Sequence, residues 1–116
     1  MSTPMKEKKD ISMRITINDI DWYLEETNDP EMLAINGDRC FSITDFQSQK
    51  IWIRAGMQVH MKQQMIMREI LQAMLFSHGF TYNMTEETLC EFVGANIRRI
   101  MKIMHAVESE MRNVEV

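Results

Sequence analysis

Cysteine and proline are scarce in this chain, with two residues each among 116, and glycine occurs four times. Cys40 and Cys90 stand far apart and form no Cys-x-x-Cys pair. Two thiols in a chain without a secretory signal are more often free than joined. We therefore expect two free cysteines and no disulfide.

Long apolar runs and an excess of basic charge are also missing. No run approaches the ~20 residues that span a bilayer, and residues 1–10 are polar where a secretory signal would be apolar. We therefore expect a cytoplasmic protein. The formal net charge of −4 argues against direct nucleic-acid binding, because nucleic-acid binders normally carry a basic stripe.

The composition is that of an ordinary soluble globular protein, with 45% apolar and 26% charged residues. Its length fits one domain with one modest core. We predict a disordered tail over residues 1–10, a single domain over 11–111 and a short C-terminal tail over 112–116.

The first half of the chain shows the alternation of apolar and polar residues that half-buried strands require. The segments with this pattern are residues 13–17, 21–24, 40–44 and 50–53. A short apolar run over 32–35 is closed by Asn36-Gly37, a strong hairpin-turn dipeptide. This half therefore predicts a small antiparallel meander of three or four strands.

The second half changes to helical spacing. One helix is predicted over about 58–78, with Gly79 as its C-terminal stop. Thr85 is a good N-cap for a second helix, and Glu86 and Glu87 place negative charge in its first turn. Apolar residues at helical spacing then continue to about Met111. Strands followed by helices, without alternation, indicate an α+β fold with two packed helices.

Thirteen methionines are a clear excess. Met57, Met61 and Met65, with His60 nearby, could suggest a soft-metal site. Core packing is favoured, because methionine fills irregular cores and these residues continue into the apolar positions of the same helix.

Residues 65–76 contain nine apolar residues out of twelve, so this stretch of helix is predicted to be buried on most sides. Its polar exceptions are Arg68, Glu69 and Gln72, which fall on one arc of about 100°. A narrow polar arc on a buried helix needs an explanation, since unpaired buried polar groups cost a few kcal/mol.

The segment Arg68-Glu-Ile-Leu-Gln72 has the frame of His-Glu-x-x-His, the zinc-binding pattern of zincins, with both histidines replaced. Its surroundings resemble those of small phage-encoded, ImmA/IrrE-like zincin proteins. Residues 45–53 look like the strand before the motif helix, and 73–80 are similar to the end of that helix. Residues 86–93 and 97–101 resemble the second helix of this family.

The resemblance covers residues 13–104 and implies a role for each matching position. Glu69 matches the general base and Glu91 the acidic third ligand, whereas Arg68 and Gln72 stand where the family has its two histidines. Arginine does not ligate zinc and amide oxygens ligate it poorly. We therefore expect no metal, no cofactor and no hydrolysis.

These four residues form the candidate polar cluster: Arg68, Glu69, Gln72 and Glu91. We hypothesise that the Arg68 guanidinium stands where zinc would be and pairs with Glu91 or Glu69, because buried carboxylates need a partner. The alternative is that Arg68 and Glu69 reach solvent at the edge of the sheet. The apolar stripe of the second helix favours this alternative for Glu91, which lies beside the stripe.

The histidines offer a weaker metal pattern. His78 follows Arg68 by ten residues, as the third ligand does in the longer zincin pattern, but Leu75 stands where that pattern has glycine. Chance explains this spacing better. His60 and His105 are predicted to be surface residues.

Other patterns that carry chemistry are absent from the sequence. There is no Gly-rich phosphate loop, no Gly-x-Ser-x-Gly and no cysteine with a nearby base. The basic residues Arg98, Arg99 and Lys102 form a small patch, for which a solvated face is favoured over an anion or nucleic-acid site.

The resemblance implies a catalytically inactive protein that acts by binding a protein partner. An accessory or counter-defence role for a phage, such as an anti-CRISPR-like inhibitor of a host nuclease complex, follows by analogy. Two alternatives stay open. One is a metal-dependent hydrolase that uses Glu69, Glu91 and His78. The other is a structural protein that associates with itself as a homodimer, with Met57, Met61 and Trp52 at the interface.

Overall fold

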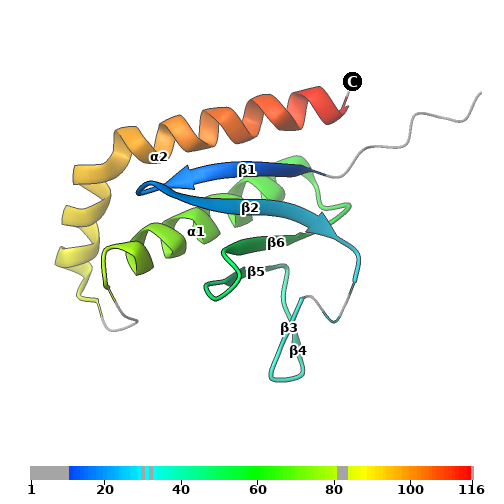
Figure 1. Ribbon diagram of the computed structural model, residues 1–116, viewed down its shortest axis with the longest axis horizontal. Helices are drawn as coiled ribbons and strands as arrows, with labels where there is room; N and C mark the ends of the chain where they lie inside the picture. Colours follow the sequence, from blue (N-terminus) through cyan, green and yellow to red (C-terminus); the bar gives the residue numbers. More distant parts are fainter. Residues whose placement is uncertain (1–10, 30, 32, 81–83, 116) are drawn as a thin grey trace, which may run out of the picture.

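Six strands and then two helices follow one another along the chain. The structure is a computed structural model that describes residues 11–29, 31, 33–80 and 84–115. Its elements are β1 (Ser12–Ile17), β2 (Ile20–Thr27), β3 (Ala34–Ile35), β4 (Asp38–Arg39), β5 (Ser42–Asp45), β6 (Lys50–Arg54), α1 (Val59–Ser77) and α2 (Glu86–Glu115). The order confirms the predicted α+β fold (Figure 1).

The structure describes most of the predicted C-terminal tail, but not the N-terminal one. Residues 1–10, predicted to be disordered, lie outside the described residues. At the other end α2 continues to Glu115, so residues 112–115 belong to the helix and the predicted end near Met111 is too early. Neither helix in the described part of the chain is long and apolar enough to cross a membrane.

Four strands form one sheet in the order β1-β2-β6-β5, and β3 pairs with β4 in a separate hairpin. The β1–β2 and β5–β6 pairs are antiparallel, as predicted. The β2–β6 pair is parallel, which a simple meander does not contain. The difference arises because β3, β4 and β5 intervene, so the chain crosses over before β6 returns beside β2 (Figure 1).

Two tight turns share one backbone conformation, which the sequence predicts for Asn36-Gly37. Asn36 and Gly37 have φ angles of 51° and 84° between β3 and β4, as a two-residue type I′ hairpin requires. Asn18 and Asp19 repeat this geometry between β1 and β2, with φ angles of 51° and 63°. The predicted apolar run before Asn36-Gly37 includes Met32, which lies outside the described residues, and its strand is limited to Ala34–Ile35.

The helix ends also match their predicted caps. Gly79 adopts a φ of 80° directly after α1, and the Phe80 N–H donates to the Leu75 carbonyl at 3.0 Å. At the start of α2, Thr85 accepts the Thr88 N–H at 3.1 Å through its side-chain oxygen. These contacts fix where the loop between the helices begins and ends.

One face of the sheet packs on α1, and α2 lies along β1 and across α1 (Figure 1). The fully buried core draws on every layer and includes Ile17, Trp22, Leu24, Ile51, Ile53, Ile66, Ile70, Met74, Ile100 and Val107. Met104 and Met111 are also buried, and Met57, Met65 and Met67 pack against this core. Core packing therefore accounts for these methionines, as predicted.

Candidate functional site

Glu69 is the one charged residue in the described chain that is buried as a whole, with 3% of its surface exposed. It lies in the middle of α1, on the same face as Ile66, Ile70 and Ala73, all of which are fully buried. A carboxylate in this position needs strong hydrogen-bond partners, because burying it without them is costly.

β5 supplies those partners. Ser42 and Thr44 lie two residues apart on this strand, so both hydroxyls are on the face that packs against α1. The Ser42 hydroxyl donates to Glu69 Oε1 at 2.7 Å, and the Thr44 hydroxyl donates to Glu69 Oε2. Both carboxylate oxygens are thus engaged, and the three residues join α1 to an edge strand of the sheet.

Asp45, the last residue of β5, makes no hydrogen bond to Glu69 among the described residues. Its Oδ1 accepts the backbone N–H groups of Gln47 and Ser48 at 3.1 and 3.3 Å, within its own turn. Hydrogen bonds from the side chain and backbone of Ser48, with that from Gln47, lower the pKa of Asp45 below its ordinary value.

The hypothesis that Arg68 pairs with a carboxylate at this position is wrong. Arg68 is exposed, and no ion pair joins it to Glu69 or Glu91 in the part of the chain that the structure describes. The reason is rotational: Arg68 precedes Glu69 by one residue, or 100° of helix, which turns it from the β5 side toward solvent. Gln72 is half-buried, and Glu91 is exposed on α2.

α1 is also less enclosed than its composition suggests. Its buried residues form one face, whereas Arg68 and Phe76 are exposed and most other positions are half-buried. The four predicted residues are therefore not one buried cluster. Glu69 alone occupies the interior, with partners from β5 that the predicted cluster did not include.

The donor set around Glu69 does not fit a zinc ion. Its two oxygens accept hydroxyl hydrogen bonds, and an arginine and an amide occupy the flanking positions where imidazoles would bind metal. Across the described residues, no three His, Cys, Asp or Glu side chains lie close enough to hold a metal ion.

The histidines are dispersed on the surface. His60 and His105 are exposed, as predicted. His78 is also exposed and caps the end of α1, where its ring meets Phe92 edge-on at a centroid distance of 5.2 Å. Cys40 and Cys90 are both free thiols, which confirms the prediction for the cysteines.

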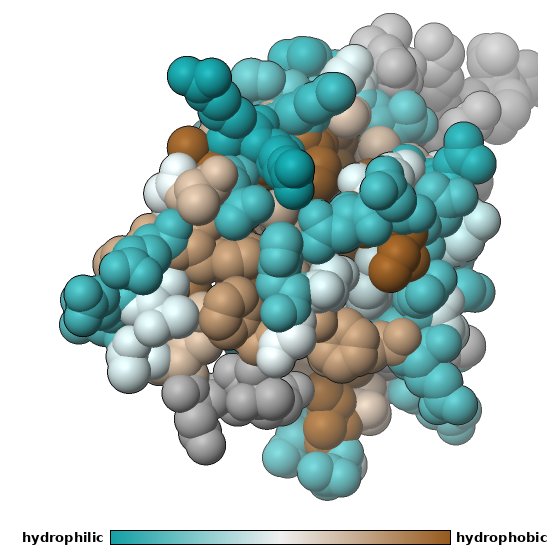
Figure 2. Space-filling model, turned by 60° about the vertical axis from the view of Figure 1, so that its left-hand side comes forward, coloured by the Kyte–Doolittle hydropathy of each residue, from teal (hydrophilic) through white to brown (hydrophobic). Residues whose placement is uncertain are grey.

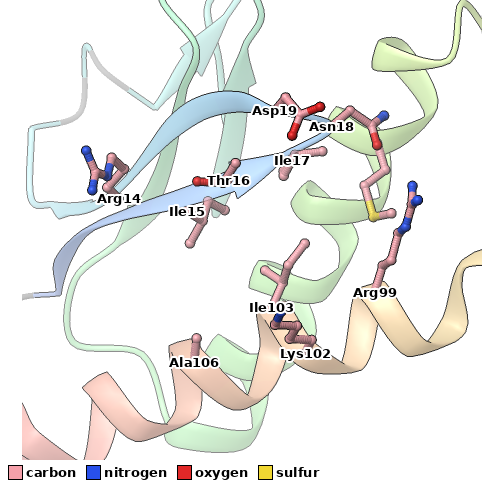
Figure 3. Close-up of a pocket in the computed structure, with 11 residues that line it drawn as sticks. Arg14, Ile15, Thr16, Ile17, Asn18, Asp19, Arg99, Lys102, Ile103 and Ala106 are labelled. Carbon is pink, nitrogen blue, oxygen red and sulfur yellow. The ribbon is translucent and has the colours of Figure 1, made fainter.

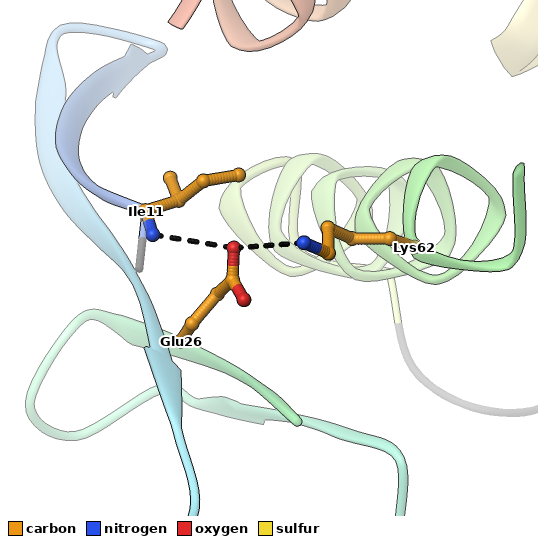
Figure 4. Close-up of polar contacts among 3 residues, drawn as sticks. All are labelled: Ile11, Glu26 and Lys62. Carbon is orange, nitrogen blue, oxygen red and sulfur yellow. Dashed lines mark hydrogen bonds and ion pairs between the residues drawn. The ribbon is translucent and has the colours of Figure 1, made fainter. Parts of the chain in front are cut away.

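A second buried carboxylate, on Glu26 of β2, was not predicted. Lys62 Nζ of α1 lies 3.1 Å from Glu26 Oε1, and the two side chains are 12% and 3% exposed. The same oxygen accepts the Ile11 N–H at 3.2 Å (Figure 4). The residues are 36 positions apart in sequence, so helical or strand spacing gives no indication of this contact.

Comparisons of this chain with protein-family models, with curated proteins and with solved structures find no match. The resemblance to zincins therefore depends on the residues and spacings described above.

Proposed function

We propose that this chain is a catalytically inactive zincin-like protein that acts by binding a protein partner. In this proposal it serves a phage as an accessory or counter-defence protein, of the kind that inhibits a host complex. The sequence resemblance supports the phage role. The hydrogen bonds and burial of Glu69 support the lack of catalytic activity.

The environment of Glu69 supports the proposal most directly. A general base must reach the water or substrate proton that it removes. Glu69 is 3% exposed and its carboxylate already accepts hydrogen bonds from Ser42 and Thr44. In this arrangement Glu69 stabilises the contact between α1 and β5, and it is not placed to activate water.

The surface is consistent with protein binding. Several large apolar side chains are exposed: Ile20, Tyr23, Ile35, Phe41, Phe76, Phe80, Leu89, Ile97 and Met101. On the face shown in Figure 2, apolar groups lie together in the middle between hydrophilic groups. Where exposed apolar groups adjoin one another they can form a protein-binding surface, whereas single ones are ordinary on soluble proteins. Met57, Met61 and Trp52, the predicted self-association residues, are half-buried and are not among these groups.

Restoring the two histidines tests the zincin resemblance. Arg68→His with Gln72→His places two imidazoles four residues apart around Glu69 on α1. If the scaffold is zincin-like, Glu91 supplies a third ligand and the double variant gains zinc binding. The measurement is a zinc titration by calorimetry.

The matched control is Arg98→His with Lys102→His, which makes the same spacing on an exposed part of α2. If Glu91 adds the third ligand that the resemblance implies, the α1 pair is expected to bind zinc at least about tenfold more tightly than the α2 pair. Equal affinities would show that the scaffold contributes nothing, and the zincin resemblance would lose its support.

A further inference from the structure

A cleft of about 500 Å³ lies between β1 and α2 (Figure 3). β1 and the β1–β2 turn form one wall, and residues 99–106 of α2 form the other. Ile103 is half-buried and offers apolar surface between the walls, and Ile15 and Ile17 lie buried beneath it. This cleft is at the opposite edge of the sheet from β5, so it is separate from the site around Glu69.

β1 is an edge strand, and its hydrogen-bonding pattern shows which backbone groups face the free edge. The Glu26 N–H donates to the Ile11 carbonyl at 2.9 Å, and the two-residue turn pairs Ile17 with Ile20. In an antiparallel pair, bonded positions recur at every second residue. Odd-numbered residues of β1 therefore bond to β2, and the N–H and C=O groups of Ser12, Arg14 and Thr16 point outward.

Those outward groups can accept another strand. In the described chain no backbone hydrogen bond other than those to β2 involves Ser12, Arg14 or Thr16. An exposed row of N–H and C=O groups is a template for an extended peptide, whose main chain completes the ladder.

The charges around the cleft are mostly positive, although the whole chain has a net charge of −4. Arg14, Arg99 and Lys102 line the cleft and are exposed, and Asp19 is the one acidic residue of its lining in the part of the chain that the structure describes. Figure 3 shows Arg14 toward one end and Arg99 toward the other, near Asn18. Arg14 also lies 3.8 Å from Asp21, in a pair that is largely solvent-exposed.

We propose that this cleft binds an extended, acidic segment of a partner protein, which adds to the sheet as a new strand beside β1. The proposal rests on the proposed protein-binding function and names the partner's chemistry. Apolar side chains of the segment contact Ile103, the one of the three isoleucines that is not buried. Its acidic side chains alternate with these and pair with Arg14, Arg99 or Lys102.

Two other occupants fit the cleft less well. A second copy of the chain that paired β1 with β1 around Arg14 would bring the basic residues of both copies together, and like charges directly opposite are destabilising. A nucleic acid would need a continuous basic stripe, whereas here apolar residues separate Arg14 from Arg99.

The test is a selection of random linear peptides, displayed as a library, on the full chain. We expect enriched peptides in which acidic residues alternate with apolar ones. Fluorescence anisotropy of the strongest peptides then compares variants. Arg99→Glu with Lys102→Glu is expected to weaken binding by about tenfold or more. Arg98→Glu, an exposed neighbour outside the cleft, is expected to leave binding nearly unchanged.

Thr16→Pro tests the strand edge without changing charge. Proline is tolerated where its missing N–H would face outward from an edge strand, so the thermal melting temperature should remain close to that of the wild type. Peptide affinity is expected to fall about tenfold, because a proline at this position cannot donate to the added strand.

Several outcomes would overturn the cleft proposal: no enriched peptide, a basic or purely apolar consensus, or binding that neither variant weakens. A dimer that Thr16→Pro abolishes would assign the edge to a second copy. If the purified chain contains no zinc, none of these results contradicts the proposed function. Zinc-dependent cleavage of the selected peptides would instead overturn the proposed function, whatever the cleft variants do.

Discussion

Replacing Lys62 with methionine is expected to lower the free energy of unfolding by about 3–5 kcal/mol, the usual cost of removing one partner of a buried ion pair. Lys62 and Glu26 are 12% and 3% exposed, so water does little to replace their interaction. Without Lys62, the Ile11 N–H is the one hydrogen-bond partner that the Glu26 carboxylate retains among the described residues. Urea denaturation measures the change.

The matched control is Arg14→Met, which removes a cation from the exposed pair with Asp21. Surface pairs contribute little, so a change below about 1 kcal/mol is expected. Adding Glu26→Leu to Lys62→Met should recover most of the lost stability, because apolar replacements for a buried pair are often neutral or stabilising. If Lys62→Met costs no more than the control, the contact between α1 and β2 does not stabilise the fold.

The second large effect is expected at β5. Combining Ser42→Ala with Thr44→Val leaves the Glu69 carboxylate buried without its two donors. Each hydrogen bond to a charged group contributes about 1.5–3 kcal/mol, so the double variant should lose about 3–6 kcal/mol of stability. The measurement is again the free energy of unfolding in urea.

Thr16→Val is the control, since it removes an exposed hydroxyl bonded to Asp21 at 3.1 Å. A cost of at most about 1 kcal/mol is expected there. Glu69→Met in the Ser42→Ala, Thr44→Val background should restore much of the stability, because all three polar groups are then replaced together. A double variant as stable as the control would mean that Glu69 has other partners and that β5 is not its support.

The local structure of this protein could be predicted from the sequence because it depends on neighbouring residues. Asn36-Gly37 predicts its turn since both positions need positive φ. Thr85 and Gly79 predict helix ends through contacts within a few residues. The change from alternating to helical spacing indicates the α+β class before any pairing is known.

The arrangement around Glu69 could be predicted only in part. The polar arc on α1 identified Glu69 correctly as a residue that needs an explanation. It could not show which side of the arc faces the sheet, because the apolar residues of this segment surround the helix. Ser42 and Thr44 had one indication in the sequence, since strand alternation places both hydroxyls on one face of β5.

Contacts between distant segments had no such indication. The parallel pairing of β2 with β6 depends on how the chain crosses over between them. The pair of Lys62 and Glu26 depends on where α1 lies against β2. Both follow from the packing of whole elements and not from the pattern within any one of them.

We propose that the carboxylate of Glu69 stabilises the packing of α1 on β5 and does not serve a metal site. The most direct test is the zinc content of the purified full chain, with the melting temperature measured before and after zinc is added. We predict far less than one equivalent of zinc and no rise in melting temperature. One equivalent that raises the melting temperature, and that Glu69→Gln removes, would contradict the account.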